Sequence, residues 1–366
     1  MRSGCVSVLP EIGHVNLRLT THSVHAGSVW RVHRAIRPAI LLLLLVATSE
    51  AWANDRLPAF SLPLECRPGA DCWIAKYVDH DPSGGVRDYL CGERASDGHG
   101  GTDFAVRDLA RMAEGVTVVA VADGVVRAVR DGMDDVAADQ STREELRGRE
   151  CGNGILLDHG SGWTTQYCHL RRASVAVRLG QSVAAGTPLG LVGMSGLADF
   201  PHVEFNVRRR DQRVDPFVGP ERGADCQPGP RPLWRPDVLA ALPYQTIPLY
   251  NAGFAPSAPK VDAVRRGEHR ETEMPTIAPA LVYWFEAFGL KAGDVLQLTL
   301  SAPDGAMLAE RRISVERDAA RYFAYVGKRR SAQRWPAGVY RGSVTAVRRN
   351  DAGNYEISRR DEVTVR

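Results

Sequence analysis

Between residues 98 and 218 the chain alternates short runs of apolar and β-branched residues with glycine-containing turns. Residues 116–121 and 125–129 flank Ala122-Asp123-Gly124, which is the pattern of a β-hairpin. Further runs of this kind cover 155–157, 164–167, 189–192 and 203–207. None of this segment has the 3.6-residue apolar period of a long amphipathic helix. The sequence therefore predicts an all-β fold built on an antiparallel sheet.

One charged insertion interrupts these runs. Residues 131–150 are dense in Asp, Glu and Arg and have no apolar periodicity. They predict a solvated loop or short helix between two strands. Two interpretations of this insertion stay open. It could form the rim of a substrate groove, or it could be an enlarged hairpin loop without a function.

The first 53 residues carry an export pattern. Arg31, Arg34 and Arg37 precede an apolar run at 39–47, and Ala51-Trp52-Ala53 follows it. A charged region, a short apolar region and an A-x-A site are typical of a signal peptide. The apolar run is too short to span a bilayer comfortably. We expect residues 1–53 to be an N-terminal extension and signal peptide, and the mature protein to be periplasmic or secreted with no stable membrane span. The net charge of +3 gives no electrostatic argument for nucleic acid.

Six of the seven cysteines remain after this cleavage, and all of them precede residue 230. An even number in an exported chain favours disulfides, although six cysteines allow fifteen pairings. Proximity favours Cys66–Cys72. A hairpin through His159-Gly160-Ser161-Gly162 would place Cys151 opposite Cys168, which leaves Cys91–Cys226. Zinc binding by these thiols is the competing interpretation, but the chain contains no C-x-x-C pair.

The rest of the chain differs in residue composition before and after residue 260. Residues 54–97 form a cysteine-containing segment before the first glycine-rich motif, and residues 219–260 are proline-rich, which predicts a surface linker. Strand-like runs then recur at regular spacing, at 281–286, 295–300, 309–315, 321–326, 338–347 and 356–365. This spacing predicts an immunoglobulin-like β-sandwich over residues 261–366. Because it has a single histidine near its start, His269, and no cysteine, we expect it to be a structural or targeting module.

Three histidine-containing motifs in the β-rich segment indicate a metal-binding site. Gly98-His99-Gly100-Gly101-Thr102-Asp103 places an imidazole and a carboxylate four residues apart, as in the mixed ligand sets that zinc favours. Tyr167-Cys168-His169-Leu170 and Pro201-His202-Val203-Glu204-Phe205 follow in the chain. Together with Val214-Asp215-Pro216, these motifs resemble the lysostaphin/LytM-type zinc metallopeptidases, which cut peptide bonds in bacterial peptidoglycan. The resemblance runs from Gly98 to Pro216, a third of the chain. It implies a metallopeptidase domain over residues 98–218 with a lysostaphin-like antiparallel sheet of the duplicated-hybrid-motif type.

The resemblance also implies roles for five side chains. His99 and Asp103 match zinc ligands, and His169 and His202 match the pair that acts on water and on the developing oxyanion. The third ligand position falls on Glu204, where the family has a histidine. A carboxylate is an acceptable zinc ligand, and strand alternation keeps His202 and Glu204 on one face. Two carboxylates and one imidazole would, however, cancel the charge of the metal and make it less electrophilic.

Two functions of different classes follow. The first is a zinc-dependent endopeptidase acting on peptidoglycan stem peptides or cross-links. The second is a catalytically degenerate, cell-wall-binding regulator of other hydrolases, with a possible protein partner at the C-terminal sandwich. Sugar binding by that sandwich would need an exposed aromatic platform, and its aromatic residues occur in strand patterns that favour a core. Candidates are Tyr283, Trp284, Phe285, Tyr322, Phe323, Tyr325 and Trp335.

Overall fold

The structure is a computed structural model that describes residues 58–139, 143–221, 226–350 and 353–366. The predicted signal peptide and its cleavage site lie outside these residues. Within the described ranges, none of the helices has the length and apolarity needed to cross a membrane. Most ordered elements are strands, and the predicted all-β class is confirmed.

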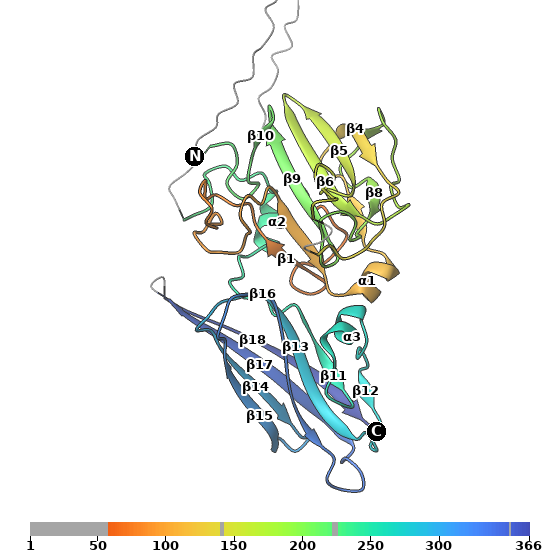
Figure 1. Cartoon of the computed structure of the whole chain (residues 1–366), viewed down its shortest axis with the longest axis vertical. Helices are drawn as coiled ribbons and strands as arrows, with labels where there is room; N and C mark the ends of the chain where they lie inside the picture. The colour runs from red at the N-terminus through yellow and green to blue at the C-terminus, as the bar shows by residue number, and fades with distance from the viewer. Residues whose placement is uncertain (1–57, 140–142, 222–225, 351–352) are drawn as a thin grey trace, which may run out of the picture. The chain divides into compact units, whose positions relative to one another are not determined.

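The first sheet contains eight strands and carries the three histidine motifs. Its order is β1 (Cys72–Lys76), β2 (Thr102–Val106), β9 (His202–Arg209), β6 (Trp163–Leu170), β5 (Asn153–Gly160), β4 (Gly124–Arg130) and β7 (Ser182–Val183), and β10 (Gln212–Arg213) pairs with β9. Every neighbouring pair is antiparallel. Figure 1 shows β9, β6, β5 and β4 side by side. A separate two-stranded sheet joins β3 (Thr117–Val119) to β8 (Pro188–Leu191).

Strand alternation divides this sheet into an apolar face and a polar face. On β9, Val203, Phe205 and Val207 are buried in a large hydrophobic cluster. The intervening positions, such as His202 and Glu204, therefore point to the opposite face. This cluster also contains Phe104 of β2 and Tyr167 of β6, so the apolar side chains of these neighbouring strands point to the same face of the sheet.

Two of the three short helices begin or end with recognisable caps. α1 (Leu109–Glu114) starts at Asp108, whose carboxylate accepts a hydrogen bond from the Arg111 backbone N–H at 2.8 Å. α3 (Val261–Arg266) ends at Gly267, which has a left-handed φ of 91°. The sequence does not predict these helices, because six residues are too few to establish a helical period.

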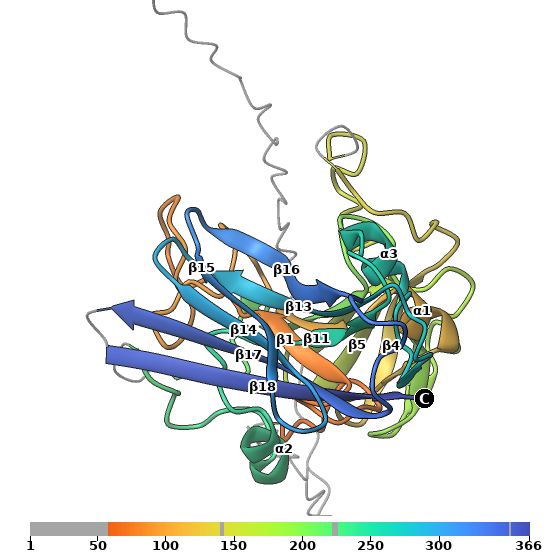
Figure 2. The same cartoon turned by 90° about the horizontal axis from the view of Figure 1, so that it is seen from below.

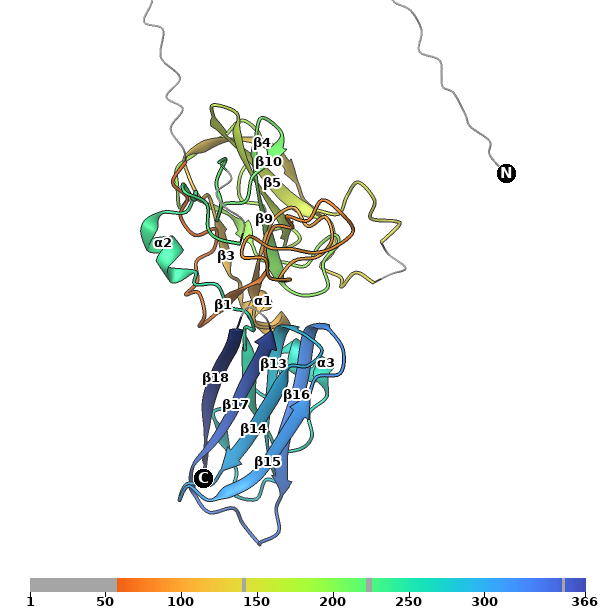
Figure 3. The same cartoon turned by 90° about the vertical axis from the view of Figure 1, so that its left-hand side faces the viewer.

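Two further sheets follow in the last third of the chain. One has the order β11 (Asn251–Ala255), β13 (Ala280–Leu290), β16 (Ala319–Arg329). The other has the order β12 (Glu273–Met274), β18 (Gly353–Val365), β17 (Gly338–Asn350), β14 (Val295–Ser301), β15 (Met307–Ser314). Figure 2 shows the long strands β17 and β18 alongside each other, and Figure 3 shows β18, β17, β14 and β15 in this order.

Both sheets contribute to one hydrophobic cluster. Leu281 and Phe285 of β13 share it with Leu296 and Leu298 of β14 and Val344 of β17. The six strand-like runs of the sequence overlap β13 to β18. Among the seven candidate aromatic residues, Tyr283, Trp284 and Phe285 are 0–2% exposed and Trp335 is 7% exposed, as expected for core residues. Tyr322, Phe323 and Tyr325 are only half-buried. The immunoglobulin-like assignment stays a prediction, and so do the domain boundaries at residues 53, 97, 218 and 260.

Residues 226–260, which belong to the predicted linker, contain ordered elements and buried residues. Leu233 and Trp234 are buried in the cluster beneath the first sheet. The helix α2 (Pro236–Ala241) begins with a proline, at a position where the missing N–H is tolerated. Strand β11 pairs with β13. The prolines thus mark turns and a helix start, and the apolar residues between them reach a core.

The three predicted disulfides are confirmed. Cys66–Cys72, Cys91–Cys226 and Cys151–Cys168 all form, with Cα–Cα distances of 6.0, 4.8 and 4.7 Å. The Cys151–Cys168 bridge agrees with the hairpin formed by β5 and β6.

Candidate metal centre and its histidines

Three adjacent strands bring the histidine motifs together on the polar face of the sheet. Asp103 of β2 lies directly opposite Glu204 of β9, and Glu204 also lies opposite Cys168 of β6. Residues directly opposite one another in an antiparallel pair project to the same side. His99, Asp103, His169, His202 and Glu204 all line one pocket of about 520 Å³.

His99 approaches the pocket from the loop before β2. Its Nε2 is 3.1 Å from Asp103 Oδ1, yet both atoms are buried and neither has a hydrogen-bond partner among the described residues. The loop passes close to β9, because a Cβ on Gly101 would lie 2.8 Å from the Phe205 carbonyl oxygen. Buried polar atoms without partners are rare, and a nitrogen and an oxygen in this arrangement are typical of metal ligands.

His169 reaches the pocket through a β-bulge. Between the pairs Ile155–Tyr167 and Asn153–Leu170, the single residue Gly154 of β5 faces two residues of β6. His169 adopts a left-handed φ of 62°. Tyr167 and Leu170 both lie in the core, so the extra residue shifts the strand phase by one and turns His169 away from the core.

Two of the three pocket histidines, His169 and His202, have their Nδ1 atoms fixed by backbone carbonyl groups. Nδ1 of His169 is 2.7 Å from the Ser195 oxygen, and Nδ1 of His202 is 2.8 Å from the Phe200 oxygen. A carbonyl oxygen can only accept, so each Nδ1 carries the proton and each Nε2 is directed elsewhere. Nε2 of His202 lies 3.7 Å from Asp103 Oδ1.

The charges of this cluster are strongly perturbed. Burial disfavours the charged form of His99, but the Asp103 carboxylate outweighs this effect and raises the pKa of His99. Burial opposes ionisation of Asp103 as well, yet His99 and His202 hold its pKa well below its usual range. At His202 burial dominates and lowers the pKa to about 4. At neutral pH Asp103 is therefore ionised and His202 is a neutral base.

Glu204 pairs with His169. Its Oε2 is 3.3 Å from His169 Nε2, and this hydrogen bond lowers the pKa of Glu204 although burial acts in the opposite direction. Because His169 Nδ1 carries a proton, the contact between Nε2 and the carboxylate is a hydrogen bond when one further proton lies between these two groups. The two side chains thus form a proton-sharing pair at the edge of the pocket.

The three predicted zinc ligands fit a divalent cation in part. His99 and Asp103 supply two converging, unpartnered atoms. Among the described residues, however, the one group of three potential ligands with all its atoms within 4.8 Å is Cys66, Asp71 and Cys72, whose sulfurs are engaged in a disulfide. Glu204 would have to turn from His169 toward Asp103 to complete the predicted set.

The charged insertion contributes to the wall of the pocket. Ala138, Asp139, Arg143 and Glu150 line it, as the groove-rim interpretation of residues 131–150 requires. Lys76 of β1 lines it as well and lies opposite Asp103 in the sheet register. Sequence reasoning missed Lys76, because no strand was predicted before residue 98.

His80 and His159 lie outside this pocket. His80 Nε2 is 2.7 Å from Asp215 Oδ2 in a separate cavity of about 780 Å³. His159 interacts through Nδ1 with the Asp123 carbonyl at 2.6 Å and through Nε2 with Thr165 Oγ1 at 2.8 Å. These contacts occupy both ring nitrogens of His159, which leaves neither free to bind a metal.

Comparison with known proteins agrees with the geometry of the first sheet. Residues 97–216 match the model of Peptidase family M23. This segment, a third of the chain, is thus similar to the LytM-type peptidases of that family.

Individual relatives match the same segment. The chain is similar to the peptidoglycan DD-endopeptidase ShyA of Vibrio cholerae, with 30% identity over 117 residues, which cover 32% of this chain and 22% of ShyA. It is also similar to the murein hydrolase activator EnvC of Escherichia coli, with 36% identity over 103 residues, covering 28% of this chain and 20% of EnvC. The chain thus spans about a fifth of the length of these curated relatives. Among solved structures, a zinc-containing peptidase from Vibrio cholerae matches 40% of this chain and 39% of its own, with 26% identity and a TM-score of 0.25.

Proposed function

We propose that the protein is an exported, zinc-dependent endopeptidase that hydrolyses peptide bonds in the stem peptides or cross-links of peptidoglycan. The observation that carries the proposal is the buried, unpartnered pair His99 Nε2 and Asp103 Oδ1 in a pocket shared with His169 and His202. The names of relatives such as ShyA support peptidoglycan as the substrate. Three disulfides support an oxidising compartment and hence the predicted export.

His99, Asp103 and Glu204 would hold the metal. When bound, zinc supplies Lewis acidity and lowers the pKa of water. His202 is the stronger candidate for the general base, because its Nε2 is unprotonated at neutral pH and directed into the pocket. Once Glu204 has turned from His169 to the metal, a doubly protonated His169 would donate a hydrogen bond from Nε2 to the oxyanion that develops on the peptide carbonyl.

A second function is favoured by a specific observation. Glu204 occupies the third ligand position and pairs with His169, and no three-ligand cluster forms around the pocket among the described residues. EnvC, which matches the same segment, is named as an activator of murein hydrolases. The competing proposal is therefore a regulator that binds the cell wall without cutting it.

Digestion of purified peptidoglycan sacculi separates the two functions. The zinc-loaded protein should release soluble muropeptides, and His202→Ala should release none while it still sediments with sacculi. New peptide amino termini, identified by mass spectrometry, would name the bond that is cut. Sedimentation of the wild type with sacculi in the absence of any release would support the regulator instead.

A further inference from the structure

His202 depends on its neighbour Phe200 in two ways. The rings of Phe200 and His202 stack with centroids 4.4 Å apart and an interplanar angle of 27°. The carbonyl oxygen of Phe200 also accepts the Nδ1 hydrogen bond of His202 at 2.8 Å. Phe200 precedes Pro201, which restricts its backbone to extended conformations. The position of Phe200 therefore sets both the plane and the tautomer of His202.

Two residues from the last third of the chain contact the Phe200 ring. Phe288 of β13 has its ring centroid 5.4 Å from that of Phe200, and the guanidinium carbon of Arg321 of β16 lies 5.5 Å from it. Phe288 in turn stacks on Tyr250 at 4.0 Å and 17°. Phe200, Tyr250 and Phe288 are each 5% exposed or less and share one hydrophobic cluster with Trp73, Ala75 and Ala105. Trp73 and Ala75 belong to β1 and Ala105 belongs to β2, so this cluster includes residues of two strands from the sheet that carries the site.

Arg321 is held in place by a buried carboxylate. Glu286 is 0% exposed and lies 3.6 Å from Arg321 Nη2, and it also accepts a hydrogen bond from Arg265 Nε at 2.9 Å. Arg321 Nη1 donates to the backbone oxygen of Asp199 at 3.3 Å, in the residue before Phe200. A guanidinium fixed at several points in this way has little freedom to leave the Phe200 ring.

We propose that Phe288 and Arg321 are positioning residues for His202 and act on it through Phe200. The C-terminal strands β13 and β16 thus help to hold His202 in position, in addition to any structural or targeting role. The inference rests on the proposed function for its kinetic consequence, but the packing of His202 that it describes can be measured without catalysis.

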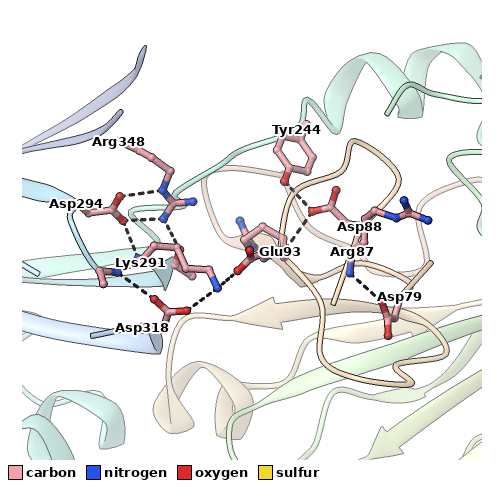
Figure 4. Close-up of polar contacts among 12 residues, drawn as sticks. Asp79, Arg87, Asp88, Glu93, Tyr244, Lys291, Asp294, Asp318 and Arg348 are labelled. Carbon is pink, nitrogen blue, oxygen red and sulfur yellow. Dashed lines mark hydrogen bonds and ion pairs between the residues drawn. The ribbon is translucent and has the colours of Figure 1, made fainter. Parts of the chain in front are cut away.

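The test compares two conservative variants with a matched control. Phe288→Leu keeps an apolar side chain without a ring, and Arg321→Lys keeps the charge next to Glu286 without the planar guanidinium. Lys291→Met is the control, because Lys291 pairs with Glu93 and, at 2.8 Å, with Asp318, in a polar network that also joins Asp294 to Arg348 and does not include Phe200 (Figure 4). Thermal unfolding checks that all three variants fold.

The first measurement is the NMR spectrum of the His202 imidazole, assigned with His202→Ala. The ring protons of His202 should shift in Phe288→Leu and in Arg321→Lys, because the stacked Phe200 ring moves, and should keep their wild-type positions in Lys291→Met. Unchanged His202 resonances in both folded test variants would overturn the proposal, whether or not the protein hydrolyses peptidoglycan.

The second measurement is steady-state hydrolysis with zinc content determined in parallel. A displaced general base lowers turnover more than binding, so kcat should fall about tenfold or more in the two test variants with KM and zinc content unchanged. Lys291→Met should stay within about twofold of the wild type in all three quantities. If the wild type is inactive, the proposed function fails, and the NMR result alone decides on the positioning role.

Discussion

At the residue scale, the pocket separates metal ligands from proton-transfer groups. His99 and Asp103 offer buried atoms without hydrogen-bond partners, whereas His169 and His202 are anchored by Nδ1–H bonds to backbone oxygens. The two kinds of residue should therefore respond differently to truncation.

His169→Ala and His202→Ala should each retain zinc and lose at least about 100-fold in kcat, as expected when an acid–base group is removed. Parallel metal analysis and muropeptide release on the same samples measure both quantities. Loss of zinc from either variant would show that the histidine is a ligand and that our assignment of roles is wrong.

His159 gives a separate, pH-dependent prediction. Burial lowers the pKa of His159 in the folded protein below the usual value of 6.5. Below about pH 6.5 the unfolded chain thus binds a proton that the folded chain does not, and the free energy of unfolding should fall as the pH drops through this range. His159→Gln should flatten this dependence in urea unfolding between pH 5 and pH 7.5. An equally steep dependence in the variant would assign the effect to another group.

At the element scale, the β6 bulge is the feature that the sequence could not reveal. Alternation correctly predicted that His202 and Glu204 share one face of β9. The same rule applied to β6 would place His169 beside Tyr167 in the core, and only the extra residue opposite Gly154 turns it outward. Bulges depend on tertiary packing and on a left-handed residue, here a histidine, and neither leaves a pattern in the strand itself.

The Cys151–Cys168 disulfide is attached directly to this bulge, because Cys168 is one of its two residues on β6. The Cys151 carbonyl accepts a hydrogen bond from the His169 backbone N–H at 2.8 Å. Replacing both cysteines by serine should therefore lower kcat about tenfold or more, with zinc retained. The paired change Cys66→Ser and Cys72→Ser is the control, since each bridge stabilises by about 2–4 kcal/mol but only the first adjoins His169. Equal kcat in the two double variants would contradict a specific role of the Cys151–Cys168 bridge.

At the scale of the whole molecule, the sequence predicted the strand-rich architecture because turn residues and alternating runs are local signals. It did not predict that β1 joins the first sheet or that residues 219–260 supply Leu233, Trp234 and strand β11 to ordered cores. Both depend on partners far away in the chain. For the same reason, the contacts of Phe288 and Arg321 with Phe200 left no motif.

We propose that His99, Asp103 and Glu204 form one zinc site, and metal analysis of the purified protein is the decisive test. We expect one zinc per wild-type chain. Removal of a ligand should weaken zinc binding by more than the roughly 10–100-fold typical of outer-shell changes, so Glu204→Ala should emerge from dialysis without metal, whereas Glu204→His should keep it. A wild-type protein that is folded but free of metal in the presence of zinc, or a Glu204→Ala variant that binds zinc as tightly as the wild type, would contradict the account.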